Sequence, residues 1–369
     1  MTGLPDRGEK LGDKSGEDFR EDMRLPGSGN AAARRVLSAA ELAPLTTLDD
    51  ARSLRAVAQT FGFIAAAIAL GVAVWPSPWV LLAVLVLGIQ QHGLFILAHE
   101  AAHYRLHSHR GLNDALGRAI GMAGGVSMCT YRVTHRLHHN NLYGPEDPDT
   151  AIHGGYPRGV AYLWKKLLQD LAGLNAWKTY AYFFGAPAIN EATQRAARPL
   201  DDTSPALRAA ARRDRGGVVA CHVAAPLLAL AAFGLQGLAL YAVLWVLPLL
   251  TVLQPVLRLR AVCEHGAVND LSSPLTAART TLSTGARSGR AIDRLCNAAG
   301  RVLLFPHHVN YHVEHHLYPA VPHYHLPRLH ALLWSGGALA GAQVCDLRDT
   351  LGRVFAPRRA RSIRLQETP

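Results

Sequence analysis

The amino-acid sequence predicts an all-α integral membrane protein, with four transmembrane helices arranged as two hairpins and a cytosolic helical cap that carries histidines. Two blocks, 56–99 and 216–257, contain no Lys, Arg, Asp or Glu, and each is more than 40 residues long. One bilayer crossing needs about 20 apolar residues, so each block accommodates two crossings and a turn. The alternative, that both blocks are buried core helices of a soluble enzyme, fits two such long uncharged runs poorly.

Turn residues divide each block into two helices. The stretch WPSPW (75–79) separates helices expected at about 57–75 and 79–98. In the second block GLQG (234–237) is the best break, with helices expected at about 217–234 and 238–257. Glycine and proline interrupt a helix because of their backbone conformations, so these stretches mark the tips of the two hairpins.

The charged segments decide the predicted topology. Lys and Arg are frequent before the first block, between the blocks and after the second, whereas the two hairpin tips contain none. The positive-inside rule then places both termini and the middle segment in the cytosol. The first 50 residues lack the apolar core of a signal peptide. We therefore expect a multi-pass membrane protein, with a disordered segment at 1–40, a membrane domain at 41–335 and a basic tail at 336–369. The abundance of Ala, Arg, Gly and Leu is typical of a GC-rich bacterial genome, which favours a bacterial inner membrane.

The composition also excludes some function classes. The net charge of +11 follows from the same topology rule, and its basic residues suit an acidic protein partner. They are scattered and accompany no nucleic-acid-binding motif, so nucleic acid is not an expected ligand. The five cysteines form no C-x-x-C pair, which argues against a disulfide framework or an iron–sulfur site.

Histidines form three clusters beside the apolar blocks. The chain has 19 histidines, and eight of them stand in HEAAH (99–103), HRLHH (135–139) and HVEHH (312–316). Residues four apart share one face of a helix, so each cluster can aim its imidazoles at one site. Eight neutral imidazoles exceed the needs of one tetrahedral zinc and suit two metal ions with open positions. Imidazole alone does not distinguish iron from zinc, copper or nickel.

With these clusters in place, the sequence resembles the membrane fatty acid desaturases, the histidine-box di-iron family that includes related hydroxylases and ketolases. The most specific stretch is NYHVEHHLYPAVPHYHLPRLH (310–330), with DPDT (147–150) and RAVCEHG (260–266) as further matches. The resemblance implies that nine histidines surround two irons, with His265 as the ninth. The implied ligands are His99, His103, His135, His138, His139, His265, His312, His315 and His316.

The resemblance also implies the chemistry. Two non-haem irons would activate O2 and remove hydrogen from an unactivated C–C bond, with electrons from an external ferredoxin-like donor. A fatty acyl chain is the default substrate, while dihydrorhizobitoxine, hydroxylation or ketolation remain open. Metal-bound histidines usually donate their second N–H to an oxygen. Candidates for that supporting role are Glu100, Asp147, Asp149, Glu264, Asn310 and Glu314.

Two other function classes compete with this interpretation. HEAAH also fits a membrane zinc peptidase, in which His99 and His103 bind zinc and Glu100 is the base. Such a peptidase has no use for two H-x-x-H-H clusters. A metal transporter would need ionisable residues inside the membrane helices, where only His92 and His222 occur. We expect no ligand role for His107, His109, His307 or His308.

Overall fold

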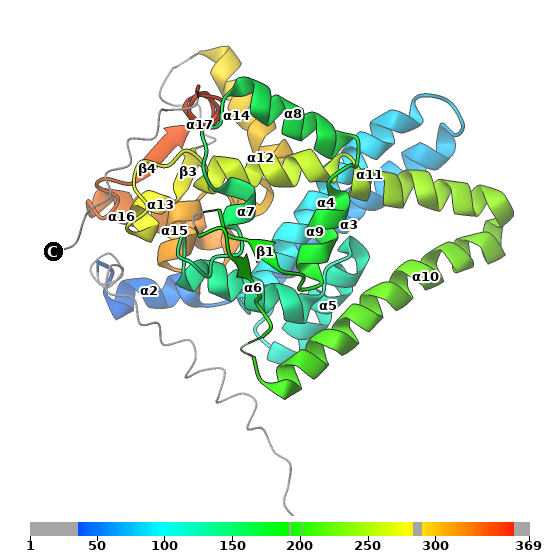
Figure 1. Ribbon diagram of the computed structural model, residues 1–369, viewed down its shortest axis with the longest axis horizontal. Coiled ribbons are helices and arrows are strands. Elements are labelled where there is room, and N and C mark those ends of the chain that lie inside the picture. The colour runs from blue at the N-terminus through cyan, green and yellow to red at the C-terminus, as the bar shows by residue number, and fades with distance from the viewer. Residues whose placement is uncertain (1–35, 192, 202, 283–289, 358–369) are drawn as a thin grey trace, which may run out of the picture.

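The protein is mostly helical, as its sequence predicts. A computed structural model describes residues 36–357 except 192, 202 and 283–289. Most of the segment predicted to be disordered, 1–35, and the end of the predicted basic tail, 358–369, lie outside the described residues. Figure 1 shows long helices that project to one side of a body made of shorter helices and two small sheets.

The first charge-free block forms two long helices, α3 (Asp50–Ala73) and α4 (Val80–Ala102), which pack side by side. Asp49 caps α3 by accepting the N–H of Arg52. Both helices are long and apolar enough to cross a membrane. Each is longer than predicted, since α3 begins in a charged turn and α4 continues past His99.

The second charge-free block forms one long bent stretch. It consists of α10 (Pro205–Tyr241), the π-helix η2 (Ala242–Val246), α11 (Leu247–Leu250) and α12 (Leu253–His265). Together these make the third candidate span among the described residues, Pro205–His265. Gly234 interrupts α10 with φ 61° and ψ −152°, inside the predicted GLQG break, and α10 bends back sharply in Figure 1. By length and composition the described part of the chain thus has three candidate spans where four were predicted, because the bent stretch counts as one.

The segment between the two blocks forms short helices and one small sheet. Its strands β1 and β2 pair antiparallel, with Ala188 opposite Ala197. These elements are α5 (Arg110–Gly124), α6 (Met128–Asn140), α7 (Thr150–His153), α8 (Val160–Leu171), α9 (Ala176–Phe183), β1 (Ala188–Ile189) and β2 (Ala196–Ala197).

The C-terminal part packs beside α12 and includes part of the predicted tail. Strand β3 pairs in parallel with β4, so residues beyond 335 join the folded body. Its elements are α13 (Pro274–Ala277), β3 (Arg279–Leu282), α14 (Ala291–Leu303), η3 (Pro306–His308), α15 (His312–Leu317), η4 (His323–His325), α16 (Leu326–Ser335), β4 (Gln343–Asp346) and α17 (Leu347–Val354). Helix α2 (Ala39–Thr46) packs its buried Leu45 into the same apolar cluster as α15 and α16.

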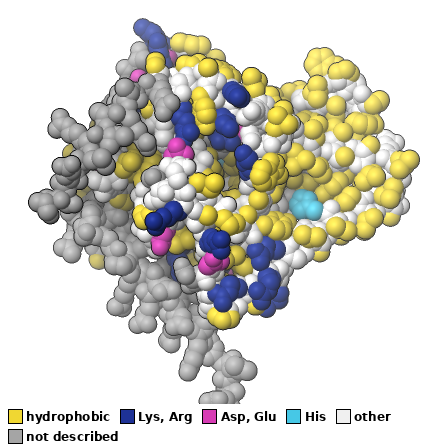
Figure 2. All heavy atoms as spheres, viewed as in Figure 1, with side chains coloured by type: hydrophobic (Ala, Val, Ile, Leu, Met, Phe, Trp, Pro, Cys, Tyr) yellow, Lys and Arg dark blue, Asp and Glu magenta, His cyan; other side chains and the backbone are white. Residues whose placement is uncertain are grey.

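The surface divides into an apolar end and a charged body. Figure 2 shows hydrophobic side chains covering the end where α3, α4 and α10 turn, whereas Lys and Arg lie on the middle of this face, among other side chains. Large apolar side chains are exposed there, including Trp79, Leu81, Leu228, Phe233 and Leu235. Such an extended apolar surface is stable only when a non-aqueous phase covers it, which identifies a membrane protein.

Candidate metal centre

Four helices deliver the nine predicted histidines to one place. His99 and His103 stand at the C-terminal end of α4, and His265 is the last residue of α12. Helix α6 carries its three histidines in its last two turns, after an N-cap in which Ser127 accepts the N–H of Thr130. The short helix α15 carries the remaining three. The structure therefore brings segments more than 200 residues apart into contact.

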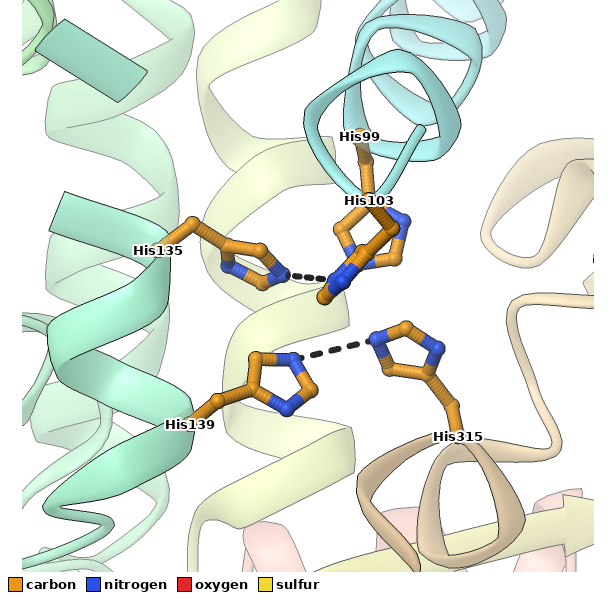
Figure 3. Close-up of side chains that lie close together, drawn as sticks. All are labelled: His99, His103, His135, His139 and His315. Atoms are coloured by element: carbon orange, nitrogen blue, oxygen red, sulfur yellow. Dashed lines mark hydrogen bonds between the residues drawn. The ribbon is translucent and has the colours of Figure 1, made fainter. Parts of the chain in front are cut away.

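Five of these histidines form a group that we call site A. One ring nitrogen of each lies within 4.8 Å of the others. Figure 3 shows the rings converging from three sides, with His135 Nε2 at 2.8 Å from His103 Nε2 and His139 Nε2 at 3.1 Å from His315 Nε2. The members of site A are His99, His103, His135, His139 and His315.

The other four histidines form a second group, site B, which the same distance criterion defines. His265 Nε2 lies 3.2 Å from His138 Nε2 and 2.8 Å from His312 Nε2. His312 Nε2 in turn lies 3.2 Å from His316 Nε2. The members of site B are His138, His265, His312 and His316, and all four are buried.

These separations fit ligands that share an ion. Two imidazole nitrogens, each at about 2.1 Å from one metal and at right angles, lie about 3.0 Å apart. The observed Nε2–Nε2 distances in both sites fall between 2.8 and 3.2 Å. The residues present therefore fit two imidazole-bound metal ions, although the geometry does not choose the metal.

Hydrogen bonds at the outer ring edges give independent support. His138 Nδ1 lies 3.0 Å from the Asp147 carboxylate, and His265 Nδ1 lies 3.1 Å from the carbonyl of Ala277. Both oxygens only accept, so both Nδ1 atoms must donate, and two neutral rings would then face each other with bare Nε2 lone pairs. A cation between them resolves this conflict, and it is either a proton or a metal ion.

The electrostatics of the two sites agree with this reasoning. Burial lowers the pKa of His103 to about 3 and holds the pKa values of His135, His139, His312, His315 and His316 well below the usual range. These imidazoles are neutral at pH 7 and able to bind a metal. His138 differs, because the carboxylates of Asp147 and Asp149 outweigh its burial and raise its pKa to about 9. Without an ion, a proton therefore occupies site B.

Four of the six predicted supporting residues lie beside the nine histidines. Asp147 accepts from His138, and an oxygen of Asp149 lies 3.7 Å from the same nitrogen. Glu100 lies 3.4 Å from His99 Nδ1, and Glu264 lies 3.6 Å from His312 Nε2.

The other two predicted supporting residues form different contacts. Glu314 accepts from Thr280 and pairs with His330, each at 2.5 Å. Asn310 donates to the backbone carbonyl of Thr281 on β3. Both fasten α15 and the segment before it to neighbouring elements.

The histidines expected to have no ligand role lie outside both sites. His107 accepts the N–H of His109, and His109 caps α5 by accepting the N–H of Leu112. His307 lies 3.1 Å from the hydroxyl of Thr60 on α3. His92 is buried, belongs to neither group, and has no hydrogen-bond partner among the described residues.

Sequence reasoning missed two residues near site B. His153 groups with His138 and Asp147, and Arg260 binds Glu264 through a 2.7 Å bond. His153 belongs to no H-x-x-H-H cluster, and only its position just after DPDT could have drawn attention to it. Arg260 is four residues before Glu264 on α12, a spacing that favours an ion pair on a helix.

Comparisons of the sequence with known proteins agree on one protein family. The fatty acid desaturase family model matches residues 52–344, which is most of the chain and includes all nine histidines. A probable fatty acid desaturase, DES1, from Sorghum bicolor is 27% identical over 282 residues, covering 71% of this chain and 66% of that protein. Dihydrorhizobitoxine desaturase from Bradyrhizobium elkanii is 27% identical over 255 residues, covering 65% and 64%. The chain thus spans slightly less than two thirds of either relative's length.

Proposed function

The chain belongs to the fatty acid desaturase family, and from this premise we propose that it is an O2-dependent membrane oxidoreductase that desaturates a fatty acyl chain at a non-haem di-iron centre. The observation that carries the proposal is the division of nine histidines, most of them buried, into groups of five and four. A centre with a single metal ion would not need a second group of histidines whose ring nitrogens also face one another.

When bound, two irons supply O2 activation and removal of hydrogen from an unactivated C–H bond. The protein's residues hold the imidazoles in place for that chemistry. Asp147 and the Ala277 carbonyl fix the tautomers of His138 and His265, so that Nε2 of each points inward. Most of these histidines are buried, which keeps bulk water away from both groups.

The placement of Glu100 disfavours the peptidase alternative. A catalytic base must reach the water on the metal, but the Glu100 carboxylate lies toward His99 Nδ1 and accepts the backbone N–H of His323 at 2.9 Å. HEAAH is therefore better explained as a histidine box whose glutamate links α4 by a hydrogen bond to the segment after α15.

We further propose that each apolar block crosses a bacterial inner membrane twice, with both termini and the metal centre in the cytosol. The basic residues on the charged body support this orientation. They also suit an acidic, ferredoxin-like protein as the external electron donor.

A hydrophobic substrate such as a fatty acyl chain is favoured by a mostly apolar, open pocket of about 420 Å³ among the apolar helices. It lies among α3, α5, α10 and η2 and is lined by residues that include Ile68, Ala225, Phe233, Leu240 and Leu244. The relative from Bradyrhizobium supports dihydrorhizobitoxine as the second candidate substrate, at equal identity. Hydroxylation of either substrate is the alternative outcome of the same hydrogen removal, and ketolation would need a second round of oxidation at the hydroxylated carbon.

The test is expression of the full chain with a ferredoxin donor in a bacterial host, followed by lipid profiling by mass spectrometry. We expect about two irons per chain and a new unsaturated acyl product. His315→Ala should remove iron from site A and abolish the product, whereas the control His107→Ala should retain both. An unchanged lipid profile with fully loaded enzyme would reject the acyl substrate, and one zinc per chain would reject the di-iron centre.

A further inference from the structure

Arg279 is a buried cation on strand β3 that the nine-histidine centre does not use. Its exposed fraction is 0%. Within the part of the chain that the structure describes it forms no ion pair, and its hydrogen bonds all end on uncharged oxygens. Burying a charge is costly unless the group is well paired, so an arginine at this position indicates a specific role.

The guanidinium holds the end of α12. Nη1 donates to the carbonyl of Cys263 at 2.8 Å, and Nη2 donates to the carbonyl of Ala267 at 2.9 Å. These two acceptors flank His265, the last residue of α12. The last carbonyls of a helix have no partner within it, and the helix dipole attracts a cation to the same end. Ala267 has a φ of 56°, a left-handed conformation that a residue other than glycine keeps only when its neighbours hold it.

Strand β4 orients the guanidinium. Gln343 stands opposite Arg279 in the parallel pair of β3 and β4, and its Oε1 accepts from Nε at 3.2 Å and from Nη2 at 3.0 Å. Gln343 is buried, although it lies in the segment 336–369 that the sequence predicts as a basic tail. These contacts connect that segment to the last turn of α12, which carries a member of site B.

We propose that Arg279 is a positioning residue for site B, which keeps the end of α12 in the place from which His265 Nε2 meets the other ring nitrogens. This inference rests on the proposed di-iron centre. The His265 ring is oriented by the carbonyl of Ala277, two residues before Arg279 in the chain, at 3.1 Å from Nδ1. Because Arg279 ties Cys263 and Ala267 to the same segment, α12 cannot move relative to that carbonyl.

The test measures metal binding by the full-length protein in detergent, using Fe(II) without oxygen and Co(II) as a spectroscopic probe. In Arg279→Gln we expect one ion to bind about tenfold more weakly and the other to bind as in the wild type. Tenfold is the lower end of the loss that follows removal of a partner of a metal ligand. The weakened ion should be the one that His265→Ala removes, and its visible Co(II) bands should change.

Two substitutions of Gln343 decide the question if Arg279→Gln does not fold. Gln343→Leu removes the acceptor at similar volume and should weaken the same ion. Gln343→Glu keeps an oxygen for the guanidinium and should bind both ions as the wild type does. A role in packing alone predicts no loss of metal affinity in Gln343→Leu, because leucine fills a similar volume.

The matched control is Arg258→Gln. Arg258 lies earlier on α12 and pairs with the buried Asp170 on α8. This variant should lower the melting temperature and still bind both ions with wild-type affinity. Wild-type affinity and Co(II) spectra in both Arg279→Gln and Gln343→Leu would overturn the assignment, as would equal losses at both ions or in the control. Failure of the wild type to bind two ions would instead reject the di-iron centre itself.

Discussion

Replacing Asp147 by asparagine should weaken metal binding at site B and leave site A intact. In the wild type, one carboxylate oxygen accepts from His138 Nδ1 at 3.0 Å and from the N–H of Asp149 at 2.9 Å. The other oxygen accepts from the N–H of Tyr143 at 2.8 Å. Asparagine offers one oxygen and one NH2 group, so in either orientation its NH2 faces a backbone or ring N–H.

The size of the effect follows from these contacts. If the amide oxygen faces His138, the tautomer survives, but the negative charge that supports the ring is lost and the N–H of Tyr143 has no acceptor. Removing such an outer partner costs 10–100-fold in metal affinity, or about 1.4–2.7 kcal/mol. The buried unpaired N–H should lower the free energy of unfolding by about 1–3 kcal/mol as well.

The assay is competition between the protein and a chelator for Fe(II), which resolves the release of two ions. Asp170→Asn is the matched control, because Asp170 is equally buried but pairs with Arg258 between α8 and α12. It should lower thermal stability without changing metal affinity. Two ions held with wild-type affinity in Asp147→Asn, or an equal affinity loss in the control, would refute the reasoning.

Metal binding at site B should release one proton from His138, because the pKa of this histidine is about 9 when no ion is bound. The metal affinity of site B should therefore rise about tenfold per pH unit between pH 7 and 9. An affinity that does not change with pH in buffered titrations would contradict this. Gly88→Ala should lower the free energy of unfolding by about 1–3 kcal/mol, because a Cβ at this position would lie 2.5 Å from the Cβ of Val252. The control Gly62→Ala should be tolerated, since a Cβ there would have no atom within 4 Å. Thermal melting of both variants in detergent makes the comparison. Chelation of both ions should lower the melting temperature, since ions that bind only the folded state stabilise it, and an unchanged melting curve would argue against structural coupling.

The sequence by itself determined the membrane class and the identity of the eight clustered histidines, and the ninth, His265, came only from the family resemblance. Charge-free runs of this length have few alternatives, because a bilayer crossing requires continuous apolar residues. The i, i+4 spacing also determines which histidines share a face: His135 with His139, and His312 with His316. Each of these pairs does belong to a single site in the structure.

Only the tertiary structure decided which histidine-bearing helix faces meet at each site. The middle histidine of each H-x-x-H-H cluster, His138 or His315, belongs to the other site, because its direction from the helix axis differs by about 100° from that of the next residue. Which pairs then share a site depends on how α4, α6, α12 and α15 pack, and packing between segments far apart in the chain leaves no local pattern. For the same reason the contact of Glu314 with His330 and the packing of the His153 ring on His265 appear only in the folded protein.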